Sequence, residues 1–271
     1  MKIAAAQISC VPGDLAANLE KIRDFCTRAK EGGAELIVFP EMVDTGYTMP
    51  VIREQAKVWS EGAVPVLREI ARTLALTIVC GVSERDRACI YNTQIAVDAS
   101  GEIATKYRKT HLFSPKPVEE DKCFTAGYAL ATHQLGSFRL GLSICYDLRF
   151  PEVYRTLAID EDADVFVISS AWPFPRAEHL RVLAMARAIE NQSYLVLANR
   201  VGRDAGVGFC GGSAIIDPSG TVMAAASIDR EDLILADLSR MVLDSVRERM
   251  PVLTHRRAEL YGPRGNRAPR A

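Results

Sequence analysis

The sequence predicts an α/β fold of four layers, an α-β-β-α sandwich in which two mixed β-sheets pack between outer helices. Two observations carry this prediction. Helix-like and strand-like patterns alternate along the chain, and the strand-like runs are apolar throughout, as in strands that helices cover. Three elements of the first half also recur in the same order in the second half, which suggests two similar sheets.

The alternation begins at the N-terminus, where the first residues are expected to form a strand. Between Asp14, a plausible N-cap, and Gly32, apolar side chains follow the three-four spacing of an amphipathic helix. Residues 36–39 and 76–82 are short apolar runs that predict buried strands, and a helical period covers 63–74 between them. The first half therefore alternates between α and β elements.

The internal repeat consists of two strand-like runs and one hairpin turn. Generic strand and turn segments could produce the same similarity by chance, so duplication is a hypothesis at this point. If it is correct, each half contributes one sheet with its own outer helices. The matching pairs are 34–39 with 163–168, 76–82 with 194–200, and the turn 98–101 with 217–220.

The chain is expected to form one domain over residues 1–271, with 253–271 as a C-terminal extension, because no Pro/Gly/Ser-rich linker divides it. Its last residues, 262–271, carry arginines among Gly and Pro. We expect a mobile or draped end there rather than a phosphate-binding arm.

Charge and cysteine content narrow the partners and the compartment. A formal net charge of −1 gives no field that would attract nucleic acid or an anionic membrane, which favours small-molecule partners. No run of apolar residues is long enough to cross a bilayer. Seven cysteines lack C-x-x-C or metal-type spacing, which speaks against a disulfide scaffold or a zinc site and fits a reducing cytoplasm.

Cys145 is the candidate nucleophile. Apolar and other side chains alternate from Ser137 to Cys145, which predicts a strand with Cys145 at its end, on the less apolar and less crowded face. A turn follows, with Pro151 suited to the first position of a helix. Backbone amides at such a corner favour a thiolate and can hold an oxyanion. A lone cysteine is more often a small buried hydrophobic residue, as we expect for the other six.

Glu41 and Lys109 are the candidate base and cation. Glu41 lies just past a buried strand, where burial raises the pKa of a carboxyl group toward the range useful for a general base. Lys109 follows the first hairpin, within a basic run that would ordinarily be a solvated face. A lysine at a strand end can stabilise the tetrahedral oxygen that a thiolate attack creates.

Three stretches together resemble the nitrilase superfamily of carbon-nitrogen hydrolases: Phe39-Pro-Glu41, Tyr107-Arg-Lys109-Thr-His-Leu-Phe, and Ile144-Cys145-Tyr-Asp-Leu-Arg-Phe-Pro-Glu. The resemblance implies an α-β-β-α sandwich, with Glu41 as general base, Lys109 as stabiliser of the tetrahedral intermediate and Cys145 as nucleophile. It also implies a second glutamate, for which Glu120 fits the pattern, although the adjacent Glu119 leaves its register open. No metal or organic cofactor is implied.

The short motifs are most similar to the ω-amidase and deaminated-glutathione-amidase branches, which implies a small amide that bears a carboxylate. Arg149 could bind that carboxylate, or it could pair with Asp147 or Glu152 and stiffen the turn. Further candidate contacts with the substrate are Tyr47, Tyr146 and Trp172. Trp172 could equally pack at a subunit contact. Hydrolysis of an N-carbamoyl compound or of a nitrile is the alternative on the same site.

Two readings from other classes compete with this one. A papain-like hydrolase would pair Cys145 with one of the four histidines, and a binding protein on the same fold would not react at all. The resemblance also implies a homodimer or higher homo-oligomer, in which the C-terminal segment crosses the interface. Residues 253–261 could be such an interface segment.

Overall fold

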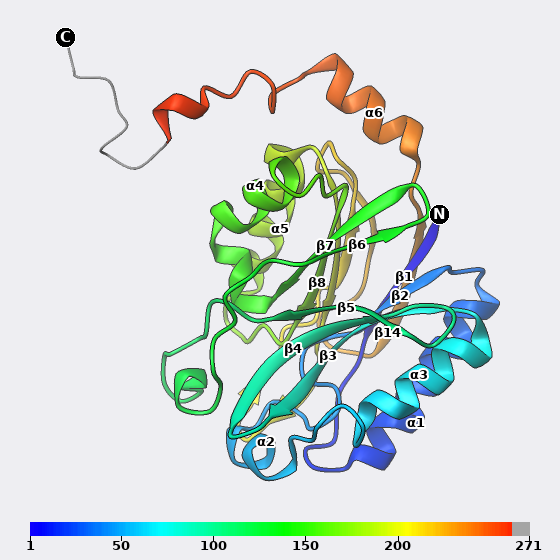
Figure 1. Cartoon of the computed structure of the whole chain (residues 1–271), viewed down its shortest axis with the longest axis vertical. Coiled ribbons are helices and arrows are strands. Elements are labelled where there is room, and N and C mark those ends of the chain that lie inside the picture. The colour runs from blue at the N-terminus through cyan, green and yellow to red at the C-terminus, as the bar shows by residue number, and fades with distance from the viewer. Residues whose placement is uncertain (262–271) are drawn as a thin grey trace.

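Two six-stranded sheets pack face to face between helices in the computed structural model, which describes residues 1–261 (Figure 1). In the first sheet, β1, β2 and β3 are parallel and the other neighbours are antiparallel, so the sheet is mixed as expected. Its order is β14 (Asp232–Asp237), β1 (Lys2–Gln7), β2 (Leu36–Val38), β3 (Thr77–Asp86), β4 (Cys89–Val97) and β5 (Ile103–Arg108).

The second sheet repeats this plan. Strands β7, β8 and β9 are parallel, and β12 and β13 follow β9 as an antiparallel hairpin, as β4 and β5 follow β3. All three repeated sequence pairs fall on corresponding elements, so the predicted two-fold plan is confirmed. The order is β13 (Val222–Ala225), β12 (Ala214–Ile216), β9 (Tyr194–Asn199), β8 (Val165–Ser170), β7 (Phe138–Ile144) and β6 (Thr132–Leu135).

Helices cover both outer faces. α1 and α3 lie on the first sheet, and α4 and α5 lie on the second (Figure 1). The bounds of α3 are those predicted, and the Asp14 side chain caps α1 by accepting a hydrogen bond from the Ala17 amide. The helices are α1 (Leu15–Glu31), α2 (Met49–Gln55), α3 (Ala63–Leu74), α4 (Pro151–Ile159), α5 (Ala177–Asn191) and α6 (Arg240–Arg249). Three short 3-10 helices are η1 (Glu120–Lys122), η2 (Cys145–Arg149) and η3 (Ala258–Leu260). A separate two-stranded hairpin is formed by β10 (Arg203–Asp204) and β11 (Val207–Gly208).

The strands are apolar throughout because each is buried on two sides. In β1, Ile3 and Ala5 pack against the second sheet, whereas Ala4 and Ala6 pack with the residues of α1 and α3. Val38 faces the second sheet in the same way and Ile37 faces the helices. This double burial explains why period-two alternation is missing from these runs.

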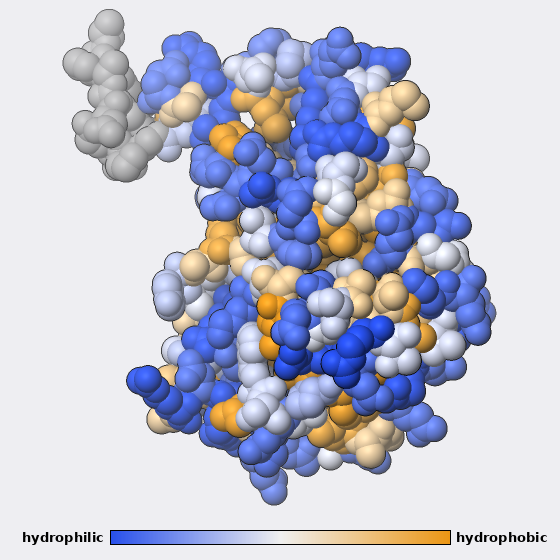
Figure 2. Space-filling model, turned by 45° about the vertical axis from the view of Figure 1, so that its right-hand side comes forward, coloured by the Kyte–Doolittle hydropathy of each residue, from blue (hydrophilic) through white to orange (hydrophobic). Residues whose placement is uncertain are grey.

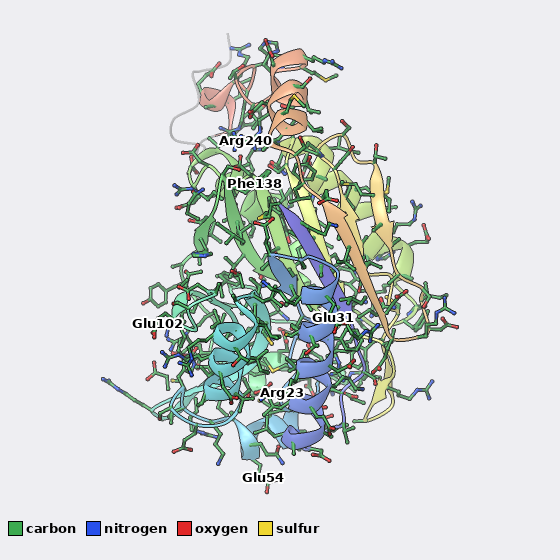
Figure 3. All side chains as sticks on the ribbon, turned by 90° about the vertical axis from the view of Figure 1, so that its right-hand side faces the viewer. Arg23, Glu31, Glu54, Glu102, Phe138 and Arg240 are labelled. Atoms are coloured by element: carbon green, nitrogen blue, oxygen red, sulfur yellow. The ribbon has the colours of Figure 1, made fainter. Side chains whose placement is uncertain are left out.

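The outer surface is mainly hydrophilic on the side that Figure 2 shows, with hydrophobic side chains in small patches between. At one end, α6 is held against the second sheet by two arginines. Arg240 Nη1 lies 2.7 Å from Asp164 Oδ2 and Arg247 Nη1 lies 2.8 Å from Asp164 Oδ1. Figure 3 shows Arg240 close to Phe138 at this end of the molecule. Within residues 1–261, none of the helices could span a bilayer.

The placement of Cys145 on an alternating strand is wrong in detail. β7 ends at Ile144, and Cys145 has a positive φ of 43° and begins η2. The face expected to be less crowded is covered by α4, since the hydroxyl groups of Ser143 and Tyr154 lie 2.9 Å apart in the interior. Cys145 is therefore presented by a turn rather than by strand alternation.

Candidate active site

Four strand ends meet where the two sheets face each other. Glu41 follows β2, Lys109 follows β5, Cys145 follows β7 and Ala171 follows β8. The predicted acid, ammonium and thiol, distant in the sequence, lie together in one buried group. The convergence follows from the topology, because the carboxyl ends of the parallel strands β2, β7 and β8 open into the same region.

Lys109 is the centre of this group. Its Nζ lies 2.8 Å from Glu41 Oε1 and 2.9 Å from Glu120 Oε1, and all three side chains have no exposed surface. Burial alone would lower the pKa of Lys109, but the charges of Glu120 and Glu41 outweigh it and raise the pKa. The lysine therefore remains an ammonium ion at neutral pH.

Glu41 accepts three hydrogen bonds. Its Oε1 receives Lys109 Nζ and, at 2.6 Å, Asn92 Nδ2, and its Oε2 receives the backbone amide of Ala171 at 2.9 Å. Burial raises the pKa of Glu41, and the adjacent charge of Lys109 opposes that rise. A carboxylate whose pKa is raised in this way is a stronger base than an exposed glutamate.

The second glutamate of the cluster is Glu120. Its Oε1 receives Tyr47 Oη at 2.7 Å as well as Lys109 Nζ, and its Oε2 receives the Phe113 amide at 2.6 Å. Glu119, the adjacent candidate, instead pairs with Lys122 Nζ at 2.7 Å near the surface. The geometry therefore favours Glu120, in the register expected from the sequence.

Cys145 lies beside these charges with 7% of its surface exposed. Burial and the negative charge of Glu41 raise its pKa well above the usual value, although Lys109 pulls the pKa down. The thiol is thus protonated at neutral pH in the free protein, and a base must remove its proton before it can attack. The positive φ of Cys145 is unusual for a non-glycine residue and is typical of functional turns.

A pocket opens directly above Cys145. Its enclosed volume is about 20 Å³, so only a small group fits directly over the sulfur. The four candidate contact residues, Tyr47, Tyr146, Arg149 and Trp172, all line it. No histidine of the described residues lines this pocket, so the papain-like alternative lacks its second catalytic group.

Arg149 does not form an ion pair with Asp147 or Glu152, which was the alternative to a role in substrate binding. Within residues 1–261 no carboxylate lies within 4 Å of it. Its guanidinium instead stacks over Trp172, 4.6 Å from the ring centroid, and Nη2 donates to His179 Nδ1 at 3.4 Å. Burial lowers the pKa of Arg149, as expected for a cation taken partly out of water without a counter-ion.

Sequence reasoning missed the role of Asp147, which it treated as a partner for Arg149. The Asp147 carboxylate is fully buried and accepts hydrogen bonds from the Ile144 amide at 2.9 Å, from Tyr107 Oη at 2.8 Å and from the His111 amide at 3.2 Å. It thereby joins the Cys145 turn to the segment that carries Lys109.

Asn92 was missed as well. Its Nδ2 lies 2.6 Å from Glu41 Oε1 and 3.2 Å from Glu120 Oε1, so one amide group bridges both carboxylates. Asn92 lies near the start of β4, and an amide buried in a strand needs hydrogen-bond partners. Nothing in the pattern, however, named the two glutamates as those partners.

Comparison with known proteins agrees with this geometry. Residues 2–248 match the carbon-nitrogen hydrolase family. The chain is 34% identical to a 2-oxoglutaramate amidase of Bacillus subtilis, covering 94% of this chain and 98% of the relative, and 30% identical to a deaminated glutathione amidase of Dictyostelium discoideum, covering 90% of each.

The chain is also similar to a solved amidase from Nesterenkonia, with a TM-score of 0.85 and 30% identity over 96% of this chain and 95% of the other. That structure is a variant with the acetamide moiety of fluoroacetamide added covalently at its active-site cysteine.

Proposed function

Because this chain belongs to the carbon-nitrogen hydrolase family, we propose that it is an amidase that hydrolyses a small, carboxylate-bearing amide and releases ammonia. The observation that carries the proposal is the buried group of Glu41, Lys109 and Glu120 beside Cys145. An ammonium ion shared between two carboxylates, next to a protonated thiol, supplies a base, a cation and a nucleophile in one place.

In the first half-reaction Glu41 takes the proton of the Cys145 thiol while the sulfur attacks the amide carbon. The oxyanion is stabilised by Lys109, which has three N–H donors and gives two of them to Glu41 and Glu120. The backbone N–H of Tyr146, in the first turn of η2, is the second donor. The C–N bond then breaks, and ammonia leaves with the proton from Glu41.

The second half-reaction hydrolyses the thioester that remains on Cys145. Glu41 takes a proton from water, the hydroxide attacks the thioester carbon, and the C–S bond breaks. Cys145 recovers a proton from Glu41, and the carboxylic acid product leaves. Glu120 keeps Lys109 charged and in place throughout, and the proposed reaction uses no metal or organic cofactor.

The pocket supports a substrate with a carboxylate. Arg149 lines the pocket together with Cys145 and has no protein counter-ion within 4 Å among residues 1–261, so it can bind a carboxylate through two parallel hydrogen bonds. Tyr47, Tyr146 and Trp172 form the remaining walls that we assign to substrate contact. The relatives named for 2-oxoglutaramate and for deaminated glutathione support the same class of amide.

Ammonia release from a panel of substrates tests the proposal. We expect 2-oxoglutaramate to be hydrolysed faster than an N-carbamoyl amino acid or an aliphatic nitrile, and Cys145→Ser and Glu41→Gln to lower kcat by at least about a thousandfold. Carbon dioxide released along with ammonia would instead indicate a carbamoyl substrate. An acyl adduct at Cys145 of the unaltered enzyme, detected by rapid-quench intact-protein mass spectrometry and missing from Cys145→Ala, would support the covalent route.

We further infer a homodimer or higher homo-oligomer and a cytoplasmic location. The oligomer is supported by exposed apolar side chains on and after α6, such as Met241 and Tyr261, which are 79% and 62% exposed. The cytoplasm is supported by seven free cysteines, since an oxidising compartment favours disulfides.

A further inference from the structure

We propose a second, outer anion-binding subsite at the mouth of the pocket, formed by Arg176, Lys116 and Arg203, which selects amides that carry a second anionic group far from the scissile bond. This inference rests on the proposed function and specifies its substrate class. Arg149 binds the carboxylate near the reacting amide, and the outer subsite binds the other one.

The pocket over Cys145 continues into an outer recess. The two share the wall residues Phe113, Val118, Pro173, Arg176 and Val207, so a ligand can pass from one to the other without leaving the protein surface. Three loops enclose the recess: the segment before η1, the loop between β8 and α5, and the β10–β11 hairpin. Its volume is about 520 Å³, against about 20 Å³ for the inner pocket, so the recess has room for a longer acyl group.

All the charged side chains that line the two spaces are cations. They are Arg149 and Arg176 in the pocket and Lys116, Arg176 and Arg203 in the recess, and no Asp or Glu lines either space. Within residues 1–261, none of these four cations has a carboxylate within 4 Å. This concentration of positive charge is local, because the whole chain has a formal net charge of −1.

Arg176 lines both spaces, and its charge acts on Arg149. Burial first, and the neighbouring charge of Arg176 to a smaller degree, lower the pKa of Arg149. An anionic group of a ligand would offset this positive charge. Phe174, 49% exposed, lines the recess and offers an apolar surface to the chain that joins the two anionic groups.

A matched pair of substrates tests the subsite. N-succinyl-L-glutamine and N-butanoyl-L-glutamine share the side-chain amide and the inner carboxylate, and they differ only in that a methyl group replaces the outer carboxylate. We expect kcat/KM for the succinyl compound to exceed that for the butanoyl compound by about tenfold or more, the effect of one charge-assisted hydrogen bond. The preference should weaken as salt is added.

Variants separate the two subsites. Lys116→Glu with Arg203→Glu should reduce the ratio of the two kcat/KM values to about one. The kcat/KM for 2-oxoglutaramate, which has no second carboxylate for the recess to bind, should stay unchanged. Arg72→Glu with Arg230→Glu is the control, because it changes the net charge equally at exposed positions that line neither space.

The experiment distinguishes failure of the outer subsite from failure of the amidase assignment. Turnover of 2-oxoglutaramate without a preference for the succinyl compound, or an equal loss of preference in the control variant, would refute the outer subsite and leave the amidase assignment intact. Absence of ammonia release from every amide would refute both.

Discussion

At the residue scale, the proposed mechanism predicts that the pKa of Glu41 determines the acid side of the pH profile. Burial raises this pKa above the ordinary glutamate value of 4.5. Glu41 must be ionised to accept the proton of Cys145, so activity is lost as the pH falls through the raised pKa. The raised pKa of Lys109 has no such cost at high pH, because it keeps the lysine charged there and so preserves activity on the alkaline side.

Asn92 is expected to tune that acid limb as a positioning residue. Its amide donates to the charged form of Glu41, and a donor to the charged form lowers a carboxyl pKa. Asn92→Ala should therefore move the acid limb of kcat/KM to higher pH and lower kcat by about ten- to a hundredfold, because the bridge between Glu41 and Glu120 is lost. The measurement is the pH profile of ammonia release.

A merely structural role for Asn92 predicts a different result. In that case the variant would lose thermal stability with an unshifted acid limb, and activity per folded molecule would be unchanged. The Oδ1 of Asn92 has no hydrogen-bond partner within the described part of the chain, so the hydrogen bonds of this side chain there go to the two carboxylates.

At the element scale, η2 is the turn that carries Cys145, the proposed nucleophile, and Asp147 holds this turn. The Asp147 carboxylate accepts hydrogen bonds from Ile144, Tyr107 and His111. An asparagine at this position would place the N–H groups of its amide against these donors, and hydrogen bonds would be lost. Asp147→Asn should therefore destabilise the protein by about 2–4 kcal/mol and also lower kcat. Urea unfolding and ammonia release measure the two effects.

Asp160→Asn is the matched control for this variant, because Asp160 is exposed just after α4 and should change stability by less than about 0.5 kcal/mol. Equal stability of the two variants would show that the Asp147 contacts do not hold the turn.

The elements themselves were largely predictable, whereas the turns between them were not. The spacing of apolar residues identified α1 and α3, because one face of each helix is buried. Continuous apolar runs identified β2 and β3, because both faces of each strand are buried. The conformation of Cys145 was missed because a positive φ at a non-glycine residue leaves no mark in the hydrophobic pattern. The contacts of Asp147 were missed as well, because they join it to Tyr107 and His111, which lie far from it in the sequence.

At the scale of the whole molecule, the repeat in the sequence predicted the architecture because each copy encodes the same strand order. Convergence of Glu41, Lys109 and Cys145 could be expected only from the family resemblance, since no local pattern fixes a contact between residues this far apart. The expectation of one domain is supported by the core that the two sheets share. Of the predicted extension 253–271, residues 262–271 lie outside the described residues, including the expected mobile end.

The described part of that extension borders a groove on the surface of the chain. Beyond α6 the chain runs past α4 and α5 (Figure 1) and leaves an open groove between Val252, His255 and Tyr261 on one side and Arg155 and Glu190 on the other. A groove of this kind, edged by exposed apolar side chains, is typical of a surface that a partner covers. We therefore expect the full chain to be a homo-oligomer of 29.7 kDa subunits.

Removal of residues 251–271 should shift the mass measured by light scattering toward that of one subunit. The active-site group should be unaffected, because Arg240 and Arg247 of α6, which remain, hold the end of the chain to Asp164. Removal of residues 262–271 alone separates their contribution from that of 251–261. A full chain with the mass of one subunit, or a shortened chain with an unchanged oligomeric mass, would contradict an interface at this segment.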